Sequence, residues 1–315
     1  MRRIGSLALL SELDPALPQM AAHRGIALIT GGCGGLGLAF ANNWLLSGGR
    51  FVKLVDLAPR AAADAAIRQL EAAHAAAGRI EYVEADVTRG DDLAAAFGAC
   101  DGRELGLVVN NAGVGELGFA KWRQQLDVNL VAVVDGTRLA LDAFGADPAA
   151  RAGDGDRVVV NVASMAGLVP LSPSPVYTAS KFGVVGFSRA MHAEARRAHR
   201  GVRVHALCPS FARTGMMNEG WIDRDRATAR VVEAFGGMMT PETVADAMFE
   251  KLVDAPSAPA CLNVTPLRGA EYDAPTTHPV ETAIKMAHLR RVGPIEAARQ
   301  MLWPKKKKHK RDRES

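Results

Sequence analysis

The sequence predicts an α/β fold, in which a doubly wound parallel sheet lies between two layers of helices, giving three layers in all. Two observations predict it. Short apolar runs alternate with helical patterns along most of the chain, and a glycine-rich turn joins the first run directly to the first helix. Such alternation is typical of βαβ units, whose right-handed crossovers place helices on both faces of the sheet. At 315 residues, with 48% hydrophobic and 23% charged residues, the chain can bury the core of a single globular domain.

The elements follow from hydrophobic periodicity. We expect strands at residues 26–30, 51–55, 80–83, 107–110, 157–162, 202–207 and 261–264, and helices at 36–46, 59–77, 90–99, 121–144, 176–199 and 241–254. Residues 1–24 are expected to be an N-terminal extension, and 25–302 a single domain that ends in two short helices at 280–302. Residues 303–315 are expected to be a basic, disordered tail.

Charge and cysteine content exclude several functional classes. The whole chain carries +4, of which residues 305–315 contribute +5, so the rest is at −1 and no nucleic acid is expected to bind the core. The four cysteines form no C-x-x-C motif, so neither a metal site nor a redox pair is indicated. Acidic residues at 12 and 14 interrupt the apolar run near the start, and no stretch is long enough to span a membrane. We expect a cytoplasmic protein.

The glycine-rich turn indicates a dinucleotide site. Gly31, Gly34, Gly35 and Gly37 stand between the first strand and the first helix, which is the setting in which a backbone can approach a pyrophosphate. Glycines also serve ordinary strand–helix junctions, but the position of this turn favours cofactor binding. Cys33 within it is interpreted as a small residue with no catalytic task.

An acid at the end of the second strand favours NAD over NADP. Asp56 lies where a carboxylate would accept hydrogen bonds from the adenosine ribose, and it would repel a 2′-phosphate. The same residue could cap the next helix, and the two roles are compatible. Arg60 and Lys53 leave NADP open, because a nearby base can neutralise a phosphate.

The stretch from Ser164 to Lys181 holds the candidate catalytic centre. Tyr177 and Lys181 stand at i, i+4 and share one helix face, so we expect the ammonium to lower the pKa of the phenol. The hydroxyl of Ser164 could hold the oxygen whose charge changes. A tyrosine and a lysine four residues apart are also common on surface helices, so this pair depends on the rest of the chain for support.

Taken together, these motifs resemble the short-chain dehydrogenase/reductase family over about residues 25–265. The turn from Thr30 to Gly37, including Leu36, resembles its T-G-x-x-x-G-x-G motif, and residues 110–113 match its N-N-A-G segment. The turn also satisfies the spacing of the longer epimerase/dehydratase branch, whereas the N-N-A-G segment and the modest length favour the compact oxidoreductase branch. Ser210 departs from the family, which usually has glycine there.

The resemblance implies a Rossmann-type domain and a hydride transfer to or from nicotinamide, with Tyr177 as general acid/base. Lys181 would adjust Tyr177 and bind the nicotinamide ribose, Ser164 would hold the substrate oxygen, and Asn129 would support a proton-carrying water. The family further implies cofactor contacts outside the turn, at Asp86, Val87, Asn110, Ala112, Gly113, Tyr177, Lys181, Pro209 and Thr214.

Apolar loops suggest the substrate. Residues 165–175 and 210–240 carry methionine and aromatic residues, which suit a hydrophobic secondary alcohol or its ketone. The alternative is that these side chains pack against each other or against a second subunit. By analogy with the family we expect a homodimer or homotetramer, and the basic tail is either a solvated end or a contact for an acidic surface. A non-catalytic dinucleotide-binding scaffold or sensor is the alternative function.

Overall fold

The computed structural model describes residues 25–74, 78–98, 105–145, 157–172, 174–198, 201–217 and 226–273. The expected extension at 1–24, the two helices at 280–302 and the tail at 303–315 lie outside the described residues. Whether one domain spans 25–302 therefore stays a prediction.

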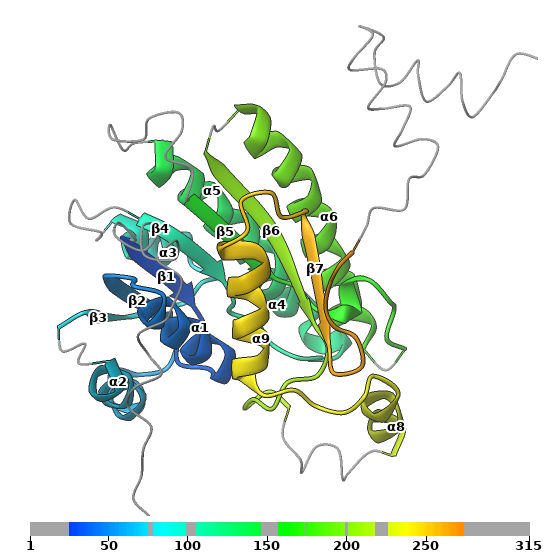
Figure 1. Cartoon of the computed structure of the whole chain (residues 1–315). Helices are drawn as coiled ribbons and strands as arrows, with labels where there is room; N and C mark the ends of the chain where they lie inside the picture. Colours follow the sequence, from blue (N-terminus) through cyan, green and yellow to red (C-terminus); the bar gives the residue numbers. More distant parts are fainter. Residues whose placement is uncertain are drawn as a thin grey trace, which may run out of the picture. The chain divides into compact units, whose positions relative to one another are not determined.

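An eight-stranded sheet forms the centre of the fold, with the strand order β3-β2-β1-β4-β5-β6-β7-β8 (Figure 1). Every neighbouring pair is parallel except β7 and β8, which are antiparallel. The strands are β1 (Ile26–Thr30), β2 (Phe51–Asp56), β3 (Ile80–Glu84), β4 (Leu105–Asn110), β5 (Arg157–Val162), β6 (Val202–Pro209), β7 (Cys261–Thr265) and β8 (Gly269–Tyr272).

Helices cover both faces of the sheet, as the doubly wound prediction requires. One face is covered by α1 (Gly35–Leu46), α2 (Arg60–His74) and α9 (Pro241–Met248), whose buried side chains form one apolar cluster with the sheet. The other face is covered by α3 (Gly90–Gly98), α5 (Ala132–Gly145) and α6 (Pro175–Ala198). Figure 1 shows α1 and α9 in front of the sheet and α5 and α6 behind it.

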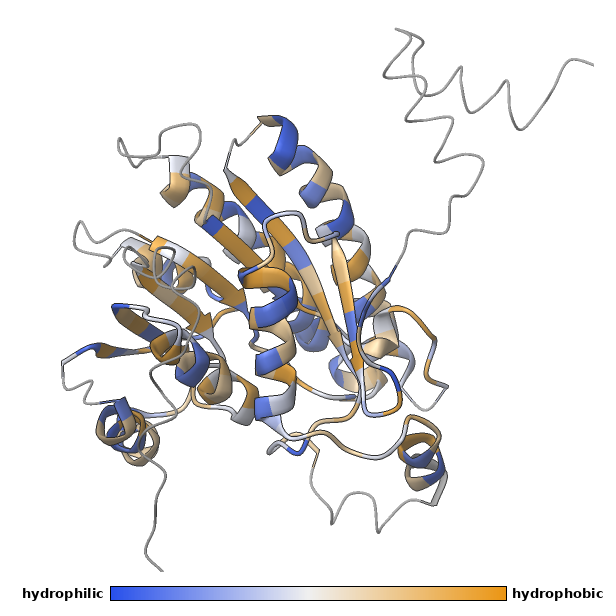
Figure 2. Cartoon of the chain, viewed as in Figure 1, coloured by the Kyte–Doolittle hydropathy of each residue, from blue (hydrophilic) through white to orange (hydrophobic). Residues whose placement is uncertain are grey.

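The central strands are mostly apolar because helices cover them on both sides. Every residue of β1, β5 and β6 is buried, and Figure 2 shows most of these strands coloured as hydrophobic. Two arginines near the starts of β5 and β6 are also buried, and backbone carbonyls accept hydrogen bonds from their guanidinium groups. Arg157 donates to the carbonyl of Phe144 at the end of α5, at 2.7 Å, and Arg203 donates to the carbonyls of Leu252 and Val253 after α9, at 2.6 and 2.8 Å. A guanidinium there satisfies carbonyls that have no partner within their own helix.

Three elements differ from the sequence-based expectation. The short strand β8 was not expected, because it is mostly exposed and contains none of the apolar runs that indicate a buried strand. The single helix expected at 121–144 is divided into α4 (Trp122–Leu126), a π-helical turn η3 (Asp127–Val131) and α5. A helix α8 (Arg226–Ala234) lies within the segment that was expected to be a substrate loop.

The strand order decides where a ligand can bind. β1 has β2 on one side and β4 on the other, so the chain leaves the ends of β1 and β4 in opposite directions. Open α/β sheets bind ligands at such a switch point, beyond the carboxyl ends of the strands. The glycine turn after β1, the N-N-A-G segment after β4 and Ser164 after β5 all lie at those ends. Within the part of the chain that the structure describes, no helix is long and apolar enough to cross a membrane.

Candidate active site

The turn after β1 is shaped by the close approach of its own backbone. A Cβ atom on Gly37 would lie 2.3 Å from the carbonyl oxygen of Gly31, so a larger residue would force the turn open. The amide of Gly34 donates to the same oxygen at 3.2 Å, and no side chain of the described residues caps the N-terminus of α1. The first amides of α1 therefore keep their hydrogen-bonding capacity for an anion. This cradle fits the diphosphate of a dinucleotide.

The N-N-A-G segment after β4 is joined to this turn. The Thr30 hydroxyl accepts hydrogen bonds from the amides of Asn111 and Ala112, at 3.0 and 3.1 Å. The Asn111 side chain donates back to the carbonyls of Thr30 and Gly31, both at 3.0 Å. The predicted cofactor residues Ala112 and Gly113 thus lie at the switch point, beside the glycine turn. Asn110 is directed away from it, because its side chain donates to Asn161 within the core at 2.8 Å.

Asp56 is fixed beside the turn at the end of β2. One carboxylate oxygen accepts the amide of Cys33 at 2.9 Å and the other accepts the amide of Ala58 at 3.1 Å. A carboxylate has further lone pairs, so it can still accept hydroxyl groups of a ribose. Asp86 follows β3 and uses one oxygen to accept both the amide and the hydroxyl of Thr88, at 2.9 and 2.7 Å. Asp86 therefore stabilises the turn after β3, and its contact with the cofactor stays a prediction.

The catalytic candidates come together where β5 ends. Ser164 caps a short 3₁₀ turn, η4 (Met165–Gly167), and its hydroxyl accepts the amide of Ala166 at 3.1 Å. Tyr177 and Lys181 lie on the first turns of α6, with the Lys181 ammonium 5.6 Å from the centre of the Tyr177 ring. The Ser164 and Tyr177 side chains are hydrogen-bonded. The structure thus brings the three predicted catalytic residues into one cluster.

Gly167 sets how closely the serine approaches the helix. A Cβ atom there would lie 2.5 Å from the carbonyl oxygen of Lys181 and 2.8 Å from a methyl group of Val185. The turn that carries Ser164 therefore lies directly on the backbone of α6. Any larger residue at position 167 would push the serine away from Tyr177.

Comparisons with known proteins agree with this geometry. A family model described as short chain dehydrogenase matches residues 25–225. The human enzyme named 15-hydroxyprostaglandin dehydrogenase [NAD(+)] is 30% identical over 273 residues, covering 81% of this chain and 96% of the relative. The chain belongs to the short-chain dehydrogenase/reductase family.

Two further members of the family are informative. D-threitol dehydrogenase of Mycolicibacterium smegmatis is 35% identical over 206 residues, covering 62% of this chain and 73% of the relative. The crystal structure of an actinorhodin polyketide ketoreductase variant with NADPH superposes with a TM-score of 0.64 at 28% identity, covering 76% of this chain and 95% of that chain. The predicted family, the Rossmann-type fold and the oxidoreductase class are confirmed.

Burial governs the charges in the catalytic cluster of this short-chain dehydrogenase. Burial raises the pKa of Tyr177, an effect that its hydrogen bond with Ser164 opposes. Burial also lowers the pKa of Lys181 to about 8, and its ammonium donates to the carbonyl of Val162 at 2.9 Å. The pKa of Tyr177 was expected to be lowered by Lys181, and this expectation is wrong, because the pKa of Tyr177 in the folded chain is raised. Loss of water disfavours the charged form of both side chains and is the largest cause of both shifts.

Asn129 lies in the π-helical turn η3, where an extra residue widens the helix. Its side-chain carbonyl accepts the amide of Val114 at 2.8 Å, and its amide donates to the Val114 carbonyl and the Ser180 hydroxyl, at 2.9 and 3.3 Å. The fully buried Asn129 therefore joins the loop after β4 to the catalytic helix. Its predicted contact with a water stays a prediction.

Sequence reasoning missed Glu116. Its carboxylate accepts the amide of Tyr177 at 2.9 Å and the amide of Gly118 at 3.2 Å. It therefore caps the first turn of α6 from the loop after β4 and holds the backbone of the catalytic tyrosine. A lone acid in a loop carries no signal for this role, because the partner amide is 61 residues away.

The loop after β6 closes the site over the glycine turn. Thr214 forms a tight turn with Met217 through two backbone hydrogen bonds, at 3.1 and 3.0 Å, and lies against Gly35 at the start of α1. Thr214 thus lies beside the glycine turn, and the cofactor contacts of Pro209 and Thr214 stay predictions. Ser210, the departure from the family pattern, has a buried hydroxyl without a hydrogen-bond partner among the described residues.

The apolar loops divide into packed and exposed side chains. Leu168 packs against the core, and the Phe211 ring packs edge-on to Phe235 with centroids 5.8 Å apart, as the packing alternative expects. Val169 and Met216 are 46% and 45% exposed. Trp221, an aromatic residue of the expected substrate loop at 210–240, lies outside the described residues. Within the described ranges, no group of three or more His, Cys, Asp or Glu side chains could hold a metal ion.

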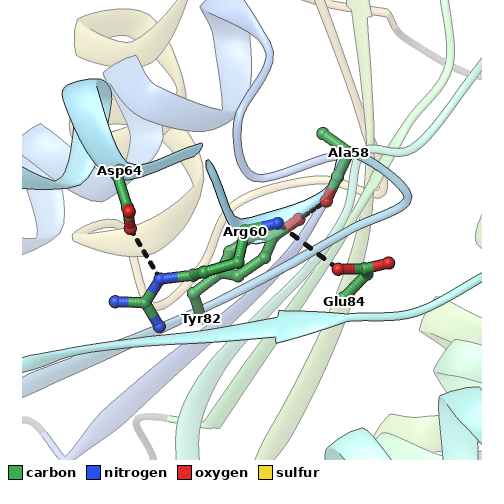
Figure 3. A network of polar contacts seen from close by, with 5 residues as sticks. All are labelled: Ala58, Arg60, Asp64, Tyr82 and Glu84. Carbon is green, nitrogen blue, oxygen red and sulfur yellow. Dashed lines mark hydrogen bonds and ion pairs between the residues drawn. The ribbon is translucent and has the colours of Figure 1, made fainter. Parts of the chain in front are cut away.

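At the adenosine end, polar contacts join β2, β3 and the start of α2 (Figure 3). The Tyr82 hydroxyl donates to the carbonyl of Ala58, and the Arg60 guanidinium lies 5.7 Å from the centre of the Tyr82 ring. Burial raises the pKa of Tyr82 to about 12 and that of Cys33 to about 11. Cys33 is therefore a neutral thiol, which agrees with its interpretation as a small turn residue.

Proposed function

We propose that this protein is an NAD-dependent dehydrogenase that interconverts a hydrophobic secondary alcohol and its ketone. The observation that carries the proposal is the cluster of Ser164, Tyr177 and Lys181 beside the turn at the end of β1. NAD is supported by Asp56 at the end of β2 and by the NAD(+) in the name of the human relative. The NADPH in the ketoreductase structure is the reason to test both cofactors.

Tyr177 acts as the general acid/base in this proposal. In alcohol oxidation its oxygen takes the hydroxyl proton, and in ketone reduction it returns that proton to the carbonyl oxygen. Nicotinamide, when bound, accepts or supplies the hydride. A phenol whose pKa is raised is protonated at neutral pH and suits the reductive direction. Lys181 opposes this bias because an ammonium stabilises the phenolate as the proton leaves.

The neighbouring groups orient the reaction. Ser164 holds the substrate oxygen within reach of Tyr177. Lys181 uses one of its three N–H groups on the Val162 carbonyl, which leaves two for the nicotinamide ribose and a water supported by Asn129. The remaining cofactor contacts that we propose are those named from the sequence: Gly31, Cys33, Gly34, Gly35, Leu36 and Gly37 at the diphosphate, Asp56 at the ribose, Asp86 and Val87 at the adenine, and Ala112, Gly113, Pro209 and Thr214 along the rest. Asn110 would contact the cofactor through its backbone, because its side chain donates to Asn161 in the core.

The substrate class rests on the exposed apolar side chains near the catalytic cluster. Val169 follows the Ser164 turn, and Met216 lies near Gly115 in the loop after β4. A Met-lined wall favours a flexible apolar substrate. The D-threitol dehydrogenase relative favours a polyol as the second candidate. A panel that pairs aliphatic and aromatic secondary alcohols with polyols separates the two, and turnover restricted to polyols would contradict the hydrophobic assignment.

Tyr177→Phe tests the mechanism. General acid/base catalysis contributes about 10²- to 10⁴-fold, so we expect a loss of that size in kcat. Binding of NADH, followed by fluorescence, should be unchanged. Tyr272→Phe is the matched control, because it removes a hydroxyl that donates to the Lys251 carbonyl on an exposed part of β8. An active Tyr177→Phe enzyme would refute the mechanism, and NADH binding without turnover in the wild type would favour the scaffold or sensor.

We further propose a cytoplasmic homodimer or homotetramer. Apolar side chains exposed on the helices after β4 and on α6 support an interface: Phe119, Trp122, Val131, Val134 and Phe182. The sulfurs of Cys208 and Cys261 lie 3.5 Å apart as thiols, which suits a reducing compartment. Light scattering with the full chain and with a chain ending at residue 304 tests the oligomer and any role of the basic tail in it.

A further inference from the structure

Two groups near the end of β2 could bind a 2′-phosphate on the adenosine ribose. One is the N-terminus of α2, a helix of 15 residues whose first amides and dipole attract anions. The other is the guanidinium of Arg60, which suits phosphate geometry. Each of the two already has a carboxylate of this chain as its partner.

Glu84 occupies the helix N-terminus. Its carboxylate accepts the backbone amide of Arg60 at 3.3 Å. It reaches that amide because Glu84 pairs with Asp56 in the register between β3 and β2, so both acids lie at the same edge of the sheet. An anion of the protein thus takes the place that a phosphate could take.

Asp64 forms an ion pair with the guanidinium of Arg60. The Nε atom of Arg60 lies 2.7 Å from its carboxylate, one helical turn along α2. The guanidinium also lies over the ring of Tyr82, whose hydroxyl donates to the carbonyl of Ala58 (Figure 3). The same hydroxyl lies 3.3 Å from the carbonyl of Asp56. The arginine side chain is therefore directed along α2 and across β3.

The second base that the sequence left open is also engaged elsewhere. Lys53 is 1% exposed, and its ammonium donates to the carbonyl of Ala96 in α3 and pairs with Glu81, both at 3.3 Å. It faces the opposite side of the sheet from α2 and does not reach the end of β2.

We propose that Glu84 and Asp64 are specificity-determining residues that exclude NADP from this dehydrogenase. Their carboxylates bind the N-terminal amide of α2 and the Arg60 guanidinium, the two groups that a 2′-phosphate would need. They also add their negative charge to that of Asp56. NADP would bring a phosphate with a charge of about −1.5 to −2 to a place already held by three carboxylates. This inference rests on the proposed binding of NAD.

The test compares the binding of NADH and NADPH, which differ only by the 2′-phosphate, by fluorescence titration of the full chain. The variants are Glu84→Gln, Asp64→Asn and the double variant, all of which keep the side-chain shape and remove charge. The measured quantity is the dissociation constant of NADPH divided by that of NADH. We expect each single variant to lower this ratio about threefold, and the double variant to lower it about tenfold or more. The gain should shrink in high salt.

Two controls make the result specific. Glu71→Gln removes the same charge from the far end of α2, about 16 Å from Arg60, where screening is nearly complete, so the ratio should change less than about twofold. Adding Arg60→Gln to the double variant should reverse the gain, because the released guanidinium is what binds the phosphate. Circular dichroism and melting temperature show that each variant is folded.

The possible outcomes separate this inference from the proposed function. An unchanged ratio in a folded double variant overturns the roles of Glu84 and Asp64 while NAD binding stands. A wild-type protein that binds NADPH and NADH with equal affinity also overturns the roles of Glu84 and Asp64. A wild-type protein that binds neither dinucleotide overturns the proposed function and this inference together.

Discussion

His205 makes the stability of this protein depend on pH in the mildly acidic range. The side chain lies in β6 with no exposed surface, and its Nδ1 atom is 2.8 Å from the Pro259 carbonyl. The pKa of His205 is lowered to about 3, mainly by burial and in smaller part by the neighbouring His192 and Arg203. The His192 ring, whose pKa burial also lowers, has its centre 5.2 Å away.

The size of the effect follows from linkage. An unfolded histidine titrates near ~6.5, so below that pH the unfolded chain binds a proton that the folded chain refuses. The contribution of His205 is therefore fully present above pH ~6.5 and is lost as pH falls toward its folded pKa, by about 1.4 kcal/mol for each pH unit. Between pH 7 and 5 the free energy of unfolding should fall by about 2 kcal/mol from this residue alone.

Urea unfolding of wild type and His205→Leu at pH 7, 6 and 5, followed by circular dichroism, measures this. The variant should be less stable at pH 7 by about 1–3 kcal/mol, because the Pro259 carbonyl loses its partner. The wild type should nevertheless lose about 2 kcal/mol more than the variant on going to pH 5. His74→Leu, outside the His192–His205 pair, is the control. Equal pH dependence in wild type and His205→Leu would refute the reasoning.

Three further predictions test polar side chains elsewhere in the structure. Glu116→Ala should lower kcat about tenfold and the unfolding free energy by about 1 kcal/mol, because the first turn of α6 loses its cap. Glu116→Gln keeps a hydrogen-bond acceptor, so it should keep most of the activity and most of the stability. Steady-state kinetics and urea unfolding compare the two variants. Arg203→Met should lower the unfolding free energy by about 3 kcal/mol, since buried carbonyls after α9 lose their donors, and an unchanged urea midpoint would contradict this. Ser210→Ala should raise the unfolding free energy by up to about 1 kcal/mol in thermal or urea melts, because it removes a buried hydroxyl without a partner among the described residues, and a clear loss of stability would show that the hydroxyl is bonded.

Much of the fold could be predicted from the sequence because the information is local. The apolar runs of β1, β5 and β6 are buried on both sides, and such strands are distinctive in any sequence. The glycine turn and the i, i+4 spacing of Tyr177 and Lys181 are likewise local, and the structure brings them to one end of the sheet. The exposed strand β8 has no such pattern.

The rest of the site depends on distances between segments that no local pattern records. Glu84 reaches α2 only because of the register of β2 and β3, and Glu116 reaches Tyr177 only because two loops meet. The predicted direction of the pKa shift of Tyr177 is wrong because spacing along a helix says nothing about how much water surrounds the phenol. Burial is a property of the whole fold.

The contact at Gly167 has a consequence for engineering this enzyme. Because backbone atoms of the Ser164 turn lie directly on the backbone of α6, the spacing of serine and tyrosine does not depend on the side chains that follow in the loop. Residues 169–172 can therefore be randomised to test whether they set substrate preference while the proton-transfer geometry is kept, provided that Gly167 and Leu168, which packs against the core, are left untouched. Chemistry and selectivity are separately adjustable at neighbouring positions of one loop.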